Sequence, residues 1–422
     1  MAVRSGLEGS NEAAQSRRIP PRWKVTNIVT DSRELWADIS GAPFLTADLP
    51  GVGGQLKREP EDFVVEEIPA YEPCGRGPFC FLWIEKRDLS SEQLLDLLSE
   101  RLEIPRSAVG LAGMKDRRAV TRQWVSIPEV DQGRLAGLEG DPRLVVLRVS
   151  RHTNKLKTGH LRGNRFIVRL RDVVPDAASR AAAIARHIAQ AGFPNYFGTQ
   201  RFGAGGRTLA LGRDLLQGRI SEQRLSPRRR RFLLRLALSA VQSWLFNGCL
   251  IERIRTGTIR RVLPGDVLQV RRSGGLFVAQ DVAREQRRFE SGVIVPTGPM
   301  FGPRMKRPHG RPERMEQQVL DVAGIDRRAF EMYPGLTSGA RRPYLVFPEA
   351  VETRAEGNDL VLRFTLPRGT YATVLLREFQ KTAGAGPVSE PDDRDASCAV
   401  EPTDDAEAVP DASAVESRKG RE

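Results

Sequence analysis

The polar segment at residues 110–124, GLAGMKDRRAVTRQW, is the densest set of side chains able to do chemistry. Its glycines permit close approach of the backbone to a ligand, and Lys115, Arg117, Arg118 and Arg122 are of the types that hold phosphates. Asp116, a single carboxylate among these cations, would stay ionised and is able to act as a nucleophile. The structural alternative is a strand that ends in a glycine turn, with Asp116 capping a following helix. Spacing alone favours that alternative, and both stay open here.

The sequence lacks the other common catalytic templates. It contains no P-loop, the glycines at residues 202–206 do not match the dinucleotide-binding spacing, and no G-x-S-x-G elbow occurs. The four histidines show no metal-ligand spacing, which argues against a histidine-based metal site. An enzyme built on this chain is therefore expected to use carboxylates, Lys, Arg and Tyr, without a metal or an organic cofactor.

The charge of the chain is unevenly distributed. Lys and Arg number 66 against 53 Asp and Glu in 422 residues, a formal net charge of +13. Residues 387–422 hold eleven acidic and four basic residues, so this tail carries −7 and the preceding chain +20. A strongly basic body favours an anionic partner, most simply a nucleic acid. Genomic composition is the alternative source of the bias, because 57 of the basic residues are Arg.

Composition also indicates which cellular compartment and which class of protein to expect. Hydrophobic residues make up 40% of the chain, enough for a sizeable core. No apolar run approaches the roughly 18 residues that a membrane span needs, and the N-terminus lacks the apolar region of a secretory signal. The four cysteines are sparse and not in C-x-x-C spacing, which is typical of a reducing cytosol. We therefore expect a cytoplasmic protein with no membrane span.

Periodicity and turn residues indicate the elements that must position these side chains. The first block is predicted to hold strands at 61–68, 79–85, 143–149 and 165–170, and helices after Ser90 and over 176–190. Ser90 and Gln93 have the spacing of a capping box. The middle block is predicted to hold a helix over 228–253, a hairpin over 267–279, a loop over 295–314 and a short helix over 327–333. Strands resume at 350–353 and 360–366. Strand-rich blocks flanking a helical middle predict an α+β domain interrupted by an inserted domain.

Several segments, in chain order, resemble motifs of the TruD family of tRNA pseudouridine synthases. Residues 113–123 resemble the signature G-x-K-D-x-x-A-x-T-x-Q, and residues 194–203 resemble P-N-Y-F-G-x-Q-R-F-G almost letter for letter. Further matches are KREPEDF at 57–63, RGNRF at 162–166, SAVQSWLFN at 239–247, and GTYAT with LRE at 369–378. The matches therefore cover most of the chain.

The resemblance implies a fold and a domain organisation. The fold is that of a pseudouridine synthase, a mixed and largely antiparallel sheet with flanking helices, into which an α/β domain peculiar to the family is inserted. The catalytic domain is expected over residues 45–194 and again over 344–386, with the insert over 195–343. Residues 1–44 are expected to be poorly ordered. The acidic tail, 387–422, is expected to be disordered, because its composition cannot support a core.

The resemblance also implies the site residues. The family's catalytic aspartate falls on Asp116, and Lys57 matches a basic position near that carboxylate, where an ammonium would favour the ionised form. Lys115 is its neighbour in the motif and is expected to support it. Positions around the target base fall on Phe63, Asn164, Phe166 and Tyr371. Core packing is the alternative for the two phenylalanines.

The implied reaction is the isomerisation of uridine to pseudouridine in tRNA, at position 13, with no cofactor. It breaks the C1′–N1 bond, turns the base and joins C5 to C1′, which suits a carboxylate beside aromatic side chains. The expected partner is tRNA, and the protein is expected to be a monomer that binds neither a metal nor a membrane. The alternative function is that of a catalytically silent RNA-binding or RNA-chaperone protein on the same fold.

Overall fold

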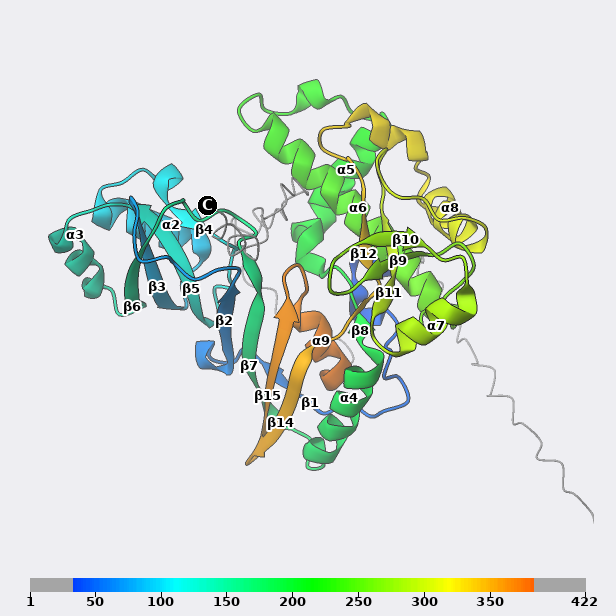
Figure 1. Ribbon diagram of the computed structural model, residues 1–422, viewed down its shortest axis with the longest axis horizontal. Coiled ribbons are helices and arrows are strands. Elements are labelled where there is room, and N and C mark those ends of the chain that lie inside the picture. The colour runs from blue at the N-terminus through cyan, green and yellow to red at the C-terminus, as the bar shows by residue number, and fades with distance from the viewer. Residues whose placement is uncertain (1–32, 383–422) are drawn as a thin grey trace, which may run out of the picture.

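The computed structural model describes residues 33–382, and a large mixed sheet runs from the left side to the lower middle of Figure 1. Nine strands form this first sheet. Their bounds are β1 (Gly53–Leu56), β2 (Phe63–Pro69), β3 (Phe79–Arg87), β4 (Gly110–Leu111), β5 (Val120–Pro128), β6 (Leu144–His152), β7 (Leu161–Val173), β14 (Glu349–Glu356) and β15 (Asp359–Pro367). The strand order is β14-β15-β7-β2-β5-β3-β6, with β1 paired to β7 and β4 to β5. Only the β2–β5 pair is parallel, so the observed sheet agrees with the predicted mixed, largely antiparallel one.

Helices α2 (Ser91–Leu102), α3 (Gln132–Ala136), α4 (Ala177–Ala191) and α9 (Ala372–Gln380) accompany the first sheet. The predicted capping box is confirmed. The backbone N of Gln93 donates to Ser90 Oγ over 3.1 Å, and the backbone N of Ser90 donates to Gln93 Oε1 over 2.9 Å. The helical spacing of Leu94, Leu98 and Leu102 places all three in a buried cluster with β3 and β5 residues. Helix α2 therefore covers the half of the sheet that carries residues 110–124.

A second sheet has the order β10-β9-β11-β12. Its strands are β9 (Val267–Val270), β10 (Leu276–Val278), β11 (Ile294–Met300) and β12 (Ala340–Pro343), and its helices are α5 (Arg207–Leu216), α6 (Arg230–Arg255), α7 (Val282–Glu290) and α8 (Arg311–Ala323). The predicted hairpin is the β9–β10 pair. These elements occupy the right side of Figure 1.

The predicted loop over 295–314 is wrong at both ends, because β11 fills its start and α8 begins at Arg311. Proline lacks the N–H that a strand interior normally uses, so Pro296 and Pro299 disfavoured a strand. The strand tolerates Pro296 because this residue takes part in the sheet through its carbonyl, which accepts a hydrogen bond from Tyr344 N over 2.9 Å.

The chain enters and leaves the second sheet region at adjacent points. Strand β8 (Phe193–Pro194) pairs antiparallel with β13 (Leu345–Val346), and Asn195 N donates to Tyr344 O over 2.9 Å. Buried residues of both regions belong to one continuous apolar cluster. The division of the chain at residues 195 and 343 therefore stays a prediction, which this junction supports.

Residues 33–44 differ from the expectation of a poorly ordered segment, whereas residues 1–32 and the acidic tail lie outside the described residues. Helix α1 (Glu34–Ala37) places Trp36 against Trp244 of α6, with ring centroids 4.9 Å apart. Asn247 Nδ2 donates to Trp36 O over 2.8 Å. A Cβ at Gly248 would lie 2.8 Å from the Trp36 ring, so this glycine leaves the space that the indole fills. The order of the segment comes from α6, about two hundred residues away in sequence, which local composition does not reveal.

One described helix, α6, is long and apolar enough by composition to cross a membrane. However, 83% of its apolar window is buried inside the protein. Its apolar faces are covered by α1, α5, α8 and β11, as in the core helix of a folded domain.

Trp36→Ala tests whether residues 33–44 belong to the core. Removing this buried indole should lower the free energy of unfolding by about 3 kcal/mol, as for other large-to-small core substitutions. Urea denaturation measures the change. Leu147→Ala is the control, because Leu147 is 47% exposed on β6 and its loss should change stability by no more than about 0.5 kcal/mol. Equal stability of the Trp36→Ala variant and the wild type would contradict the packing described here.

Candidate active site

Asp116 lies in the turn between β4 and β5 of the first sheet. No helix follows it, because β5 begins at Val120. The interpretation of Asp116 as a helix cap is therefore wrong. Its carboxylate is 37% exposed, which leaves it open to a ligand while it contacts the protein.

Lys57 supplies the ammonium that contacts this carboxylate. Its Nζ lies 3.0 Å from Asp116 Oδ1, and its side chain is only 12% exposed. The same Nζ lies 4.4 Å from the centroid of the Phe63 ring, within range of a cation–π interaction. The structure thus brings together three of the predicted site residues, Asp116, Lys57 and Phe63.

A short turn sets the spacing between Lys57 and Phe63. Lys57 follows β1 with a φ of 56°, a left-handed conformation. Residues Pro60–Asp62 then form a 3₁₀ turn in which Asp62 Oδ2 accepts from Glu59 N over 2.9 Å. Arg171 of β7 donates to the other oxygen of Asp62 over 2.8 Å. The fully buried Asp62 carboxylate therefore fixes this turn onto the sheet.

Lys86, which the sequence analysis missed, holds the backbone of the Asp116 turn. It is fully buried at the end of β3, and its Nζ donates to Asp116 O over 3.0 Å and to Leu89 O. A lysine almost never occurs fully buried without partners. The only available sequence signal was this charge at the end of the apolar run 79–85.

Lys115 points away from the Asp116 carboxylate. Its Nζ forms an ion pair of 2.8 Å with Glu67 of β2, and the two side chains are 4% and 0% exposed. Its backbone N donates to Ser91 Oγ over 3.1 Å at the start of α2. The possibility that Lys115 holds a phosphate is therefore wrong, because its charge is buried and paired. It anchors the turn that carries Asp116 to β2, and its support of the catalytic carboxylate stays a prediction.

The three nearby arginines also contact protein groups. Arg122 Nε donates to Glu85 over 2.7 Å, and Arg118 Nη2 donates to Arg58 O over 2.6 Å. Arg117 lies 3.8 Å from Asp88. All three side chains remain partly or largely exposed, so their contact with phosphates stays a prediction.

Phe63 and Phe166 are core residues as well as neighbours of the candidate site. They are 1% and 5% exposed, and their rings meet edge to face at 6.0 Å. Phe166 also stacks on Phe364 of β15 at 5.2 Å. The core-packing alternative describes both rings in this structure, and their contact with a base stays a prediction.

Asn164 lies on β7 directly opposite Glu67 of β2. Its Oδ1 is buried and has no hydrogen-bond partner among residues 33–382. A buried acceptor without a partner is costly, so such a group calls for an explanation. The contact of Asn164 with a base stays a prediction.

Tyr371 follows β15 and directly precedes α9. It is half-buried, and its ring meets Phe197 edge to face at 6.2 Å. This ring contact does not involve Asp116, Lys57 or Phe63. Its position in the site therefore stays a prediction from the motif.

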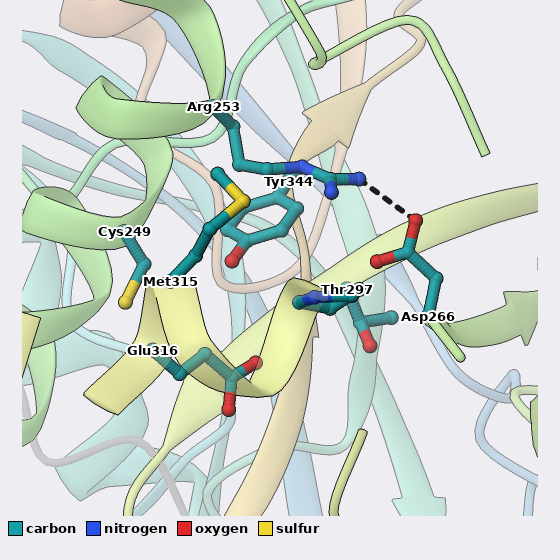
Figure 2. A pocket seen from close by; sticks show the side chains of 8 residues that line it. Cys249, Arg253, Asp266, Thr297, Met315, Glu316 and Tyr344 are labelled. Atoms are coloured by element: carbon teal, nitrogen blue, oxygen red, sulfur yellow. Dashed lines mark hydrogen bonds and ion pairs between the residues drawn. The ribbon is translucent and has the colours of Figure 1, made fainter. Parts of the chain in front are cut away.

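A small enclosed cavity lies elsewhere, between α6, α8 and the second sheet (Figure 2). Its volume is about 10 Å³, which holds one water molecule and no nucleotide. The buried ion pair of Arg253 with Asp266, 2.9 Å long, lines it together with Glu316 and Cys249. Burial raises the pKa of the Glu316 carboxyl and of the Cys249 thiol. Within residues 33–382, no group of three or more His, Cys, Asp and Glu side chains is arranged to hold a metal ion.

Comparisons with known proteins agree with the motifs. The family model of tRNA pseudouridine synthase D (TruD) matches residues 40–224 and 229–379. A relative from Anaeromyxobacter dehalogenans, tRNA pseudouridine synthase D, is 44% identical over 340 residues, which cover 80% of this chain and 96% of the relative. Its counterpart from Thermus thermophilus is 41% identical over 342 residues, covering 80% and 92%.

A solved structure supports the same conclusion for the fold. The crystal structure of a Methanosarcina mazei protein assigned as tRNA pseudouridine synthase D superposes with a TM-score of 0.65 at 26% identity. The match covers 82% of this chain and 97% of that one. The predicted pseudouridine-synthase fold with an inserted domain is thereby confirmed. The chain belongs to the tRNA pseudouridine synthase D (TruD) family.

Proposed function

We propose that this protein converts uridine 13 of tRNA to pseudouridine, with Asp116 as the catalytic carboxylate. The reaction class follows from family membership, because the family consists of tRNA pseudouridine synthases, which isomerise uridine in tRNA. The position and the residue roles are our proposal. The observation that supports them best is the half-exposed Asp116 carboxylate, which contacts the Lys57 ammonium over 3.0 Å beside the Phe63 ring.

The reaction needs a group that acts on C1′ of the ribose. One Asp116 oxygen attacks C1′, or stabilises its cation-like form, while the C1′–N1 bond breaks and uracil leaves with the electron pair. The base then turns, C5 bonds to C1′ and any bond to Asp116 breaks. C5 loses its proton to solvent and N1 takes up a proton in its place, so the net change is an isomerisation. The Lys57 ammonium, 3.0 Å from Asp116 Oδ1, holds the carboxylate in place for this exchange.

The uracil must leave its stack to reach the carboxylate. A flipped base is usually received between aromatic side chains and by hydrogen bonds to its edge. Tyr371 and the edges of Phe63 and Phe166 are the proposed receiving surface. The unpartnered Asn164 Oδ1 is the proposed acceptor for the uracil N3–H. We propose a cytoplasmic location and a monomer for this enzyme, as the sequence suggests.

Asp116→Asn tests the role of the carboxylate. The substitution preserves shape but removes the charge and the nucleophilic oxygen, so single-turnover pseudouridine formation should fall at least about a thousandfold. Binding of tRNA should be retained, because phosphate contacts dominate RNA affinity. Asp326→Asn is the matched control. Asp326 caps a 3₁₀ turn by accepting from Arg328 N, which Asn also does, and turnover should stay within about twofold of wild type. Near-normal turnover by a folded Asp116→Asn variant would overturn the assignment.

The position in tRNA is tested with two substrates that differ at one nucleotide. Unmodified tRNA labelled with tritium at C5 of its uridines should release tritium when nucleotide 13 is uridine, because isomerisation replaces that hydrogen. The same tRNA with cytidine at position 13 should release none. Equal release from both would place the target elsewhere. Binding of both tRNAs without release from either would favour the RNA-binding or RNA-chaperone alternative.

A further inference from the structure

Arg342, on the last strand of the second sheet, connects three segments that are distant in sequence. Its Nη2 donates to Asn195 Oδ1 over 2.7 Å and to Gly369 O over 2.8 Å. Its guanidinium carbon lies 4.0 Å from the centroid of the Phe197 ring. One side chain thus joins β12, the segment after β8, and the turn between β15 and α9.

The turn that Arg342 holds leads directly to Tyr371. Gly369 has a φ of 75°, a conformation that favours glycine, and Thr370 Oγ1 donates to Pro367 O over 2.6 Å. The Phe197 ring, which lies under the Arg342 guanidinium, also contacts the Tyr371 ring at 6.2 Å. The position of Tyr371 therefore depends on Arg342 along two routes, through the backbone at Gly369 and through the Phe197 ring.

The chemistry of these contacts requires an arginine. A planar guanidinium stacks on an aromatic face while its nitrogens donate in its own plane, whereas an ammonium is a compact, strongly hydrated point charge. Phe197 is fully buried, its N–H donates to Asn247 Oδ1 of α6 over 2.9 Å, and its ring meets the Phe246 ring of α6 edge to face at 5.6 Å. Arg342 is half-buried against this fixed ring. The side chain is therefore packed into a rigid support.

We propose that Arg342 is a positioning residue that orients Tyr371 for the uracil of the substrate and so couples the second sheet region to the catalytic site. It need not touch the RNA itself. The proposal rests on the proposed role of Tyr371. It predicts that Arg342 affects the chemical step at saturating tRNA, and that this effect disappears when Tyr371 is removed.

A double-mutant cycle of Arg342→Lys and Tyr371→Ala in the full-length protein tests this coupling. Arg342→Lys should lower the single-turnover rate at saturating tRNA about tenfold, within the range that misplacement of a reacting group produces. In the Tyr371→Ala background, Arg342→Lys should lower the single-turnover rate less than about twofold. The reason is that the effects of two substitutions are not additive when one residue acts through the other. Arg342→Gln supplies a second variant, and Arg354→Lys, at an exposed position on β14, is the control that should leave the rate unchanged.

Two further measurements separate the possible explanations. The thermal unfolding midpoint of Arg342→Lys should stay near that of wild type, and tRNA affinity with its salt dependence should be unchanged. Equal rate losses in both Tyr371 backgrounds would overturn the proposal. So would an effect confined to affinity with a shallower salt slope, which identifies a phosphate contact. A wild-type rate for Tyr371→Ala would overturn it as well, while the Asp116→Asn result would still decide the proposed function separately.

Discussion

The candidate site depends on one constraint, the contact between the Lys57 ammonium and the Asp116 carboxylate. The two residues are 59 positions apart and come from different strand ends, so the first sheet must bring them together. A partly exposed ion pair contributes little to stability, because water screens it. The geometry of this ion pair is therefore better explained by the proposed catalytic role of Asp116 than by a contribution to the stability of the fold.

Buried charges around this contact fix its geometry. Asp62 holds the turn after Lys57, Lys86 holds the Asp116 backbone, and Lys115 pairs with Glu67 beneath it. Taking each of these charges out of water is costly unless its partners are well placed. Each one has such partners here, so a displaced turn would leave a buried charge unpaired. This penalty disfavours displacement of the turn that carries the partly exposed carboxylate.

The sequence predicted features with local signals and missed those that arise from distant contacts. The capping box at Ser90 and the β9–β10 hairpin were predicted because adjacent residues determine them. Asp116 and Lys57 were proposed through motif resemblance, and the structure places their side chains in contact. Lys86, Glu67 and Arg342 were missed, since their partners lie on other strands and nothing in their neighbourhoods marks them. Trp36 was missed for the same reason, because the space it fills depends on Gly248 of α6.

The most direct test of this account asks whether Lys57 acts through Asp116. Single-turnover rates at saturating tRNA are measured for Lys57→Met in the wild-type background and in the Asp116→Asn background. With the carboxylate present, loss of the ammonium should slow pseudouridine formation by about thirtyfold or more, equivalent to roughly 2 kcal/mol of transition-state stabilisation. With Asn at position 116, the same change should cost less than about threefold, because no carboxylate remains to be stabilised. An equal loss in both backgrounds would contradict the claim that the two side chains work as a unit.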